Sequence, residues 1–107
     1  MESREFIDMA RRILDFESRV RERAADEITD RLNAYSPAQA SALATLLSAT
    51  AASEKEDGAL ESELHAILEL MSTGHVGLDH ISPLREIRLR EQLPPEVREY
   101  VTDMLEG

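Results

Sequence analysis

The sequence predicts an all-α fold of five or six antiparallel helices in one domain, 1–107, and three observations support this. Apolar residues recur at intervals of three and four along most of the chain, and no segment alternates with the period of two that a half-buried strand requires. The four Gly and four Pro residues separate the periodic stretches. A chain of 107 residues is the usual size of one domain with a single core.

The N-terminal stretch 3–35 contains no Gly or Pro and reads as helix throughout. Its apolar residues keep helical spacing as far as Val20, after which the spacing becomes a strict four. Each step of four rotates the apolar stripe by about 40° on a 3.6-residue helix, so a straight helix would lose its buried face. Either one long helix wraps around its neighbours, or the chain bends near Asp15 to Ser18 into two helices; both alternatives stay open.

Seven arginines in this stretch suggest a basic patch, but acidic residues precede four of them by four positions. This is the favourable orientation for ion pairs along a helix. The pairs are Asp8 with Arg12, Asp15 with Arg19, Glu17 with Arg21, and Glu27 with Arg31. We therefore interpret this face as solvated and self-paired rather than as a nucleic-acid contact.

Residues 36–53 form the next predicted helix, with Ser36 as N-cap and Pro37 at the first helical position. Leucines at its centre and many alanines along its length allow neighbours to approach on more than one side. A polar turn over 54–58 leads into the following helix, so the two helices should form an antiparallel hairpin.

The best-bounded helix of the sequence lies within 57–74. One apolar stripe runs along it through Leu60, Leu64, Ile67, Leu68 and Met71, and Gly74 stands where a left-handed cap is needed. We expect Leu64, Ile67 and Leu68 to lie in the centre of the core. His65 falls off this stripe and should face solvent.

After Gly74, a short helix is predicted to begin at Asp79 or at Ser82-Pro83, and Pro94-Pro95 starts the last helix. The residues expected on the inner face of the short helix are Ile81, Leu84 and Ile87, and those expected to cover its exit are Leu89 and Leu93.

The formal net charge of −10 opposes binding to DNA, RNA or anionic membranes, because such binding depends on basic residues. The absence of cysteine and of a long apolar N-terminal run favours a cytoplasmic protein. No nucleophile elbow, phosphate-binding glycine loop or paired metal-ligand motif occurs. His65 stands four residues from both Glu61 and Glu69, but three stacked turns of one helix cannot easily close around one metal ion. We expect no catalytic residues, no metal and no cofactor.

Residues 36 to 106 resemble two helical hairpins of a HEAT-like α-solenoid. The resemblance lies in two Ser-Pro helix starts, Ser36-Pro37 and Ser82-Pro83, which are 46 residues apart, within the spacing of about 40 to 47 residues for such repeats. It implies stacked helical hairpins. An irregular helical bundle is the alternative architecture.

The whole chain also resembles, by type, the small, acidic, all-helical immunity proteins that bacteria make against their own toxins. This resemblance implies a non-catalytic protein that binds and neutralises a toxin, often a basic one, through an acidic surface, and that is a monomer or weak dimer when free. The alternative function is a helical scaffold or regulatory module that binds other proteins or its own copy.

An acidic ridge is the candidate partner-binding surface; the alternative is that Asp57 and Glu61 stabilise a helix N-terminus while the other carboxylates keep the protein soluble. Residues 36–74 contain six acidic residues against Lys55 alone, whereas residues 1–35 are nearly balanced. If the two second helices of the hairpins lie side by side, their acidic residues form one ridge that ends at the polar turn. The predicted ridge consists of Glu54, Glu56, Asp57, Glu61, Glu69, Glu99 and Asp103.

Overall fold

The structure is a computed structural model that describes residues 1–106. It is entirely helical, and no strand occurs in this range, which confirms the predicted fold class. The elements in chain order are α1 (Ser3–Ile13), α2 (Ser18–Asp30), the 3₁₀ helix η1 (Leu32–Ala34), α3 (Pro37–Ser53), α4 (Asp57–Met71), the 3₁₀ helix η2 (Leu78–Ile81), α5 (Leu84–Ile87) and α6 (Pro95–Glu106).

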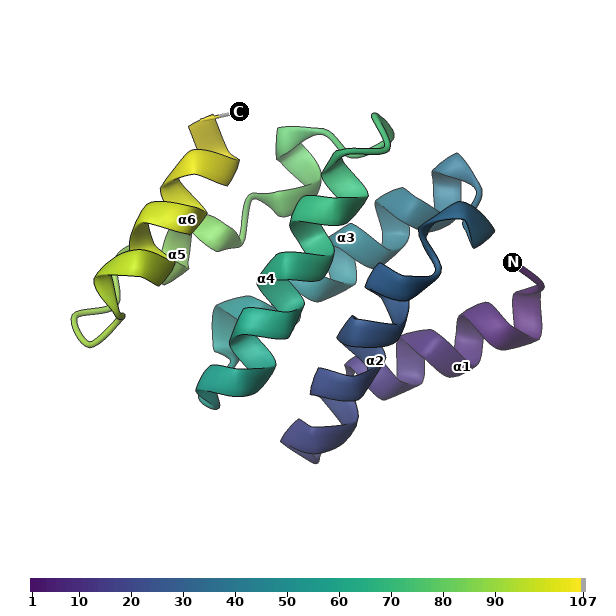
Figure 1. Cartoon of the computed structure of the whole chain (residues 1–107), viewed down its shortest axis with the longest axis horizontal. Helices are drawn as coiled ribbons and strands as arrows, with labels where there is room; N and C mark the ends of the chain where they lie inside the picture. Colours follow the sequence, from purple (N-terminus) through teal and green to yellow (C-terminus); the bar gives the residue numbers. More distant parts are fainter. Residues whose placement is uncertain (107) are drawn as a thin grey trace.

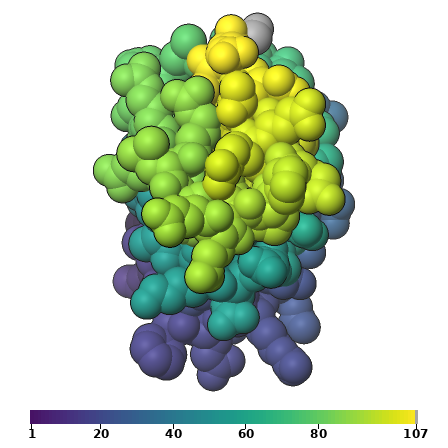
Figure 2. Space-filling view, turned by 90° about the vertical axis from the view of Figure 1, so that its left-hand side faces the viewer, coloured from purple at the N-terminus to yellow at the C-terminus, as the bar shows by residue number. Residues whose placement is uncertain are grey.

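The helices are arranged in two layers. α2, α4 and α6 lie next to one another in the front layer of Figure 1, and α1, α3 and α5 lie behind them. The central helix α3 contacts α1, α4, η2 and α5, while α4 packs extensively on α2 and only sparsely on α6. Figure 2 shows the end of the molecule formed by α5 and α6. The first 35 residues thus supply a third hairpin, α1 with α2, beside the two that the Ser-Pro starts indicated.

The question left open for residues 3–35 is settled in favour of two helices, because α1 ends at Ile13 and α2 begins at Ser18. In the turn between them, the Asp15 carboxylate accepts the Glu17 backbone N–H at 2.9 Å. The Arg21 guanidinium donates to the Asp15 and Phe16 carbonyl oxygens, both at 2.8 Å. These side chains satisfy backbone groups that a continuous helix would have paired within itself.

This break changes the predicted ion pairs. Asp8 pairs with Arg12 at 3.0 Å and Glu27 lies 3.9 Å from Arg31, as expected. The pairs Asp15 with Arg19 and Glu17 with Arg21 do not form, because a spacing of four brings side chains together only inside one helix.

The start of α3 follows the sequence prediction closely. The Ser36 hydroxyl accepts the Gln39 backbone N–H at 3.1 Å, and the Gln39 side chain accepts the Ser36 N–H at 3.0 Å, which together form a capping box. At the other end of the helix, Arg90 from the loop after α5 donates to the carbonyl oxygens of Ala51, Ala52 and Glu54. A cation at a helix C-terminus also interacts favourably with the helix dipole.

Helix α4 is buried on two sides, against α2 and against α3. Its buried residues are Ala59, Leu60, Glu63, Leu64, Ala66, Ile67 and Leu70. The prediction for Leu68 is therefore wrong: this side chain is 37% exposed, and Leu70 is fully buried instead. Leu68 falls on the edge of the apolar stripe that turns toward α6, where packing is sparse.

In the C-terminal segment, one prediction is wrong and the others agree with the structure. Gly74 ends the α4 region with φ of 82°, a conformation that favours glycine. The predicted inner residues Ile81, Leu84 and Ile87 are all fully buried, and Leu93 is also buried. Leu89, which we expected to cover the exit of this helix, is 82% exposed because it follows the end of α5 at Ile87 and points away from the core.

Alanine substitutions along α4 should distinguish its buried residues from its exposed ones by their effect on stability. Leu64→Ala and Ile67→Ala should each lower the free energy of unfolding by roughly 2 to 5 kcal/mol, because both side chains are enclosed. Leu68→Ala and His65→Ala serve as exposed controls on the same helix and should cost about 1 kcal/mol or less. Urea unfolding monitored by circular dichroism measures all four. Equal losses at Leu64 and Leu68 would contradict the placement of α4.

Candidate protein-binding surface

A groove runs between α4 and α6, which contact each other only sparsely. Its first part is lined by Glu61, Leu64 and His65 of α4 and by Glu96, Val97 and Tyr100 of α6. Tyr100 also lines the second part, which continues along the same helices. The lining of that second part is Leu68, Glu69, Met71, Ser72, Tyr100, Asp103 and Met104. We call both parts together the α4–α6 groove.

The groove has an apolar floor and acidic margins. Leu64 and Met104 are buried beneath it, and Val97 and Tyr100 are half-buried in its wall. Four carboxylates border this floor, namely Glu61, Glu69, Glu96 and Asp103. Among the described residues that line it there is no Lys or Arg, and a positive charge arises only when His65, whose Nε2 lies 3.9 Å from Glu69, is protonated. The groove therefore presents uncompensated negative charge around an apolar strip.

The predicted acidic ridge is only partly reproduced. Glu61, Glu69 and Asp103 lie on the groove, as the side-by-side placement of α4 and α6 requires. Glu99 lines a hollow on the other flank of α6 together with Arg98. Glu56 and Asp57 are exposed at the start of α4, away from the groove. Glu96, which the prediction omitted, lies on the groove because it stands four residues before Tyr100 and seven before Asp103, on the same face of α6.

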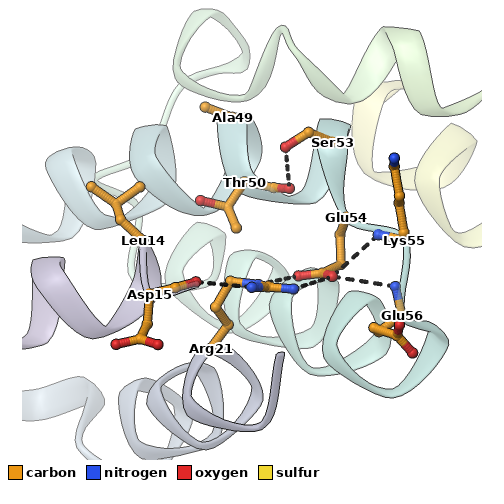
Figure 3. Close-up of a pocket in the computed structure, with 9 residues that line it drawn as sticks. All are labelled: Leu14, Asp15, Arg21, Ala49, Thr50, Ser53, Glu54, Lys55 and Glu56. Carbon is orange, nitrogen blue, oxygen red and sulfur yellow. Dashed lines mark hydrogen bonds and ion pairs between the residues drawn. The ribbon is translucent and has the colours of Figure 1, made fainter. Parts of the chain in front are cut away.

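Glu54 is not a surface residue, which corrects its assignment to the ridge. Only 3% of it is exposed, and its carboxylate binds the Arg21 guanidinium through two hydrogen bonds of 2.7 Å. Its Oε2 also accepts the backbone N–H groups of Lys55 and Glu56 at 3.1 and 3.2 Å (Figure 3). A carboxylate held by four donors inside the protein is unavailable to a partner.

The lowered pKa of Glu54 reflects these contacts. Burial by itself raises the pKa of a carboxyl group, but the hydrogen bonds from Arg21 and from the backbone outweigh it and lower the pKa of Glu54 to about 2. Glu54 is therefore an anion under all physiological conditions, and its partner Arg21 belongs to the α1–α2 hairpin. The ion pair joins that hairpin to the α3–α4 turn.

Glu63 is a second residue that the sequence predictions missed. It is 1% exposed, and without a proton neither of its carboxyl oxygens has a hydrogen-bond partner. Burial, followed by the nearby Glu54 carboxylate, raises the pKa of Glu63 to about 9. Protonated Glu63 can donate its hydrogen to Glu54. A signal was present in the sequence, since Glu63 shares a helical face with Ala59, Ala66 and Leu70.

An open pocket lies beside the ion pair, with Arg21 and Glu54 on its wall (Figure 3). Asp15, Thr50 and Lys55 also line it, but Glu63 does not. The carboxyl group with the strongly raised pKa therefore has no access to a molecule bound in this pocket. Within residues 1–106, no three His, Asp or Glu side chains converge as ligands of a metal ion. No helix in this range has the length and apolar character needed to cross a membrane.

No protein-family model, no curated protein and no solved structure matches this chain. The function is therefore inferred from the site itself.

The buried pair Glu54 and Glu63 makes stability depend on pH. Between the ordinary pKa of 4.5 and the folded value of about 9, the folded protein retains a proton on Glu63 that the unfolded chain has lost. Stability should therefore fall as pH rises through this window, by roughly 1 kcal/mol per pH unit. Glu54 acts oppositely: its stabilisation is present above pH 4.5 and is lost as pH falls toward 2.

Glu63→Gln should remove the loss of stability at higher pH, because the amide group stays neutral and can donate a hydrogen bond to the Glu54 carboxylate. Urea unfolding at pH 5, 6, 7 and 8 should give a flatter profile than wild type and a more stable protein at pH 8. Glu61→Gln, an exposed change on the same helix, is the control and should leave the wild-type slope unchanged. Parallel profiles for wild type and Glu63→Gln would show that Glu63 is ionised in the folded protein.

Proposed function

We propose that this chain is a non-catalytic protein-binding module, and that the α4–α6 groove receives a partner with a basic and apolar surface. The observation that carries the proposal is the chemistry of the groove: an apolar floor bordered by four carboxylates, with no Lys or Arg among the described residues of its lining. Apolar contact supplies binding energy, and complementary charge accelerates encounter and excludes other acidic proteins.

The more specific form of the proposal is an immunity protein that binds and neutralises a basic toxin domain in the cytoplasm. The net charge of −10 and the location of uncompensated acidic residues on one groove support it. The absence of any reaction motif from the sequence is consistent with inhibition by binding alone.

A helical scaffold of HEAT-like hairpins is the second candidate. It is favoured by the order of the helices, in which α2, α4 and α6 form one layer and α1, α3 and α5 the other (Figure 1). Hairpins stacked in this way create extended binding surfaces in repeat proteins. The two candidates share the groove and differ in whether the partner is a toxin.

The partner can be found by photo-crosslinking from the groove. A photo-reactive residue replaces Tyr100 in cells that produce the protein, and a second version carries it at exposed Asp26 on α2. We expect one partner to be captured from position 100 and not from position 26. If that partner is a toxin, cells that produce it should stop growing, and co-expression of this chain should restore their growth. A partner of a scaffold should not be toxic when it is produced alone.

Charge reversal then tests how this partner binds. Glu61→Lys with Glu96→Lys should slow association by about tenfold at low salt, because the reversed charges repel a basic surface. The control, Asp26→Lys with Asp30→Lys, makes the same change in net charge on exposed α2 residues and should have a smaller effect. Surface plasmon resonance at several salt concentrations gives the rates. Equal slowing by both pairs, or no dependence on salt, would contradict binding at the groove.

A further inference from the structure

The outer face of α1 carries an exposed stripe of alternating basic and apolar residues. Arg4, Ile7 and Arg11 follow one another at steps of three and four, which places them on one side of the helix. Leu14, the C-cap residue three positions further on, extends this row at the rim of the pocket beside Arg21. Ile7 is 51% exposed and Leu14 is 60% exposed, whereas a packed helix normally buries such side chains. We call these four residues the α1 stripe.

The two arginines of the α1 stripe are unpaired within residues 1–106. Neither Arg4 nor Arg11 donates a side-chain hydrogen bond or lies in an ion pair, and both are exposed. Arg12 on the same helix differs, since it binds Asp8 and Glu27. The stripe is therefore a basic and apolar surface on a chain whose net charge is strongly acidic.

The α1 stripe and the α4–α6 groove match in chemistry and in spacing. Arg4 and Arg11 are seven residues apart, which is about 10.5 Å along a helix. On the groove, Glu96 and Asp103 are also seven residues apart, and Glu61 and Glu69 are eight residues apart, or about 12 Å. A helix laid along the groove with its arginines against these carboxylates brings Ile7 and Leu14 toward the apolar floor.

The two surfaces cannot meet within one chain. The N-terminal hairpin and α6 lie at opposite ends of the molecule, with α4 between them (Figure 1). Figure 2 shows that the green and yellow C-terminal residues of α5 and α6 cover most of this end. Contact between the stripe and the groove therefore requires two copies of the chain.

We propose that the α1 stripe of one copy docks into the α4–α6 groove of a second copy. The contact joins two different surfaces, so it is heterologous and leaves a free stripe and a free groove at the ends of each assembly. One helix face buries less than the ~1,600 Å² of a standard interface, so the association is weak. The groove is shared with the partner proposed above, but this contact does not depend on that partner.

The test uses one variant for each surface. Arg4→Gln, Ile7→Ala and Arg11→Gln together remove the stripe but keep good helix formers at exposed positions. Glu61→Lys with Glu96→Lys reverses charge on the groove. The control, Arg19→Gln with Arg23→Gln, removes two arginines of α2 and changes the net charge as the stripe variant does. Circular dichroism first establishes that all variants keep the wild-type helical content.

Sedimentation velocity up to about 1 mM covers the affinity range of a contact this small. Wild type and the α2 control should sediment faster as concentration rises, while the stripe variant and the groove variant should each remain monomeric. An equimolar mixture of the two variants should recover association that stops at a 1:1 dimer, because only one intact stripe and one intact groove remain to meet.

A wild-type protein that stays monomeric at 1 mM would overturn the proposal. So would self-association of either single variant at the wild-type level, loss of association in the α2 control, or a mixture that remains monomeric. These results leave the proposed partner site untouched, since that site is judged by the association rate of a captured partner and not by the state of the free chain.

Discussion

The ion pair between the half-buried Arg21 and the buried Glu54 is the interaction on which the arrangement of the hairpins depends. Glu54 lies in the turn between α3 and α4, and its carboxylate binds the guanidinium that also holds the α1–α2 turn. The backbone carbonyl of the same residue accepts a hydrogen bond from Arg90, beyond α5. One turn thereby makes contact with the hairpin before it and the segment after it. A pair so enclosed is costly to break, because one charge would remain buried alone.

The packing of α4 beside this turn determines which of its sides remains exposed. Buried Glu63 of α4 lies next to Glu54 and within the electrostatic influence of Arg21, and its raised pKa keeps it protonated there. With two sides of α4 buried against α2 and α3, the exposed residues Glu61, His65 and Leu68 form the remaining side, toward α6. Because α6 contacts α4 only sparsely, that side borders a groove instead of a packed interface.

The sequence is informative where structure is decided locally and uninformative where distant residues decide it. The starts of α3 at Ser36 and of α6 at Pro95 follow from capping and from proline geometry, and both predictions are confirmed. The turn after α1 depends on Arg21, whose partner lies 33 residues away, so spacing alone could not choose between one helix and two. Exposure of Leu68 likewise depends on where α6 lies. Glu63 is visible in the sequence as an acid on an apolar face, and the predictions omitted it.

Arg21 and Glu54 should be energetically coupled if their ion pair holds the hairpins together, and a double-mutant cycle measures this coupling directly. Arg21→Gln, Glu54→Gln and the double variant are unfolded in urea near pH 5, where a folded-state pKa of about 9 keeps Glu63 protonated in the wild type. The low pH also favours a neutral Glu63 in the variants. We predict a coupling free energy of roughly 1 to 3 kcal/mol, with the double variant losing less stability than the two single losses combined. Additive losses, with a coupling near zero, would contradict the central role of the α3–α4 turn.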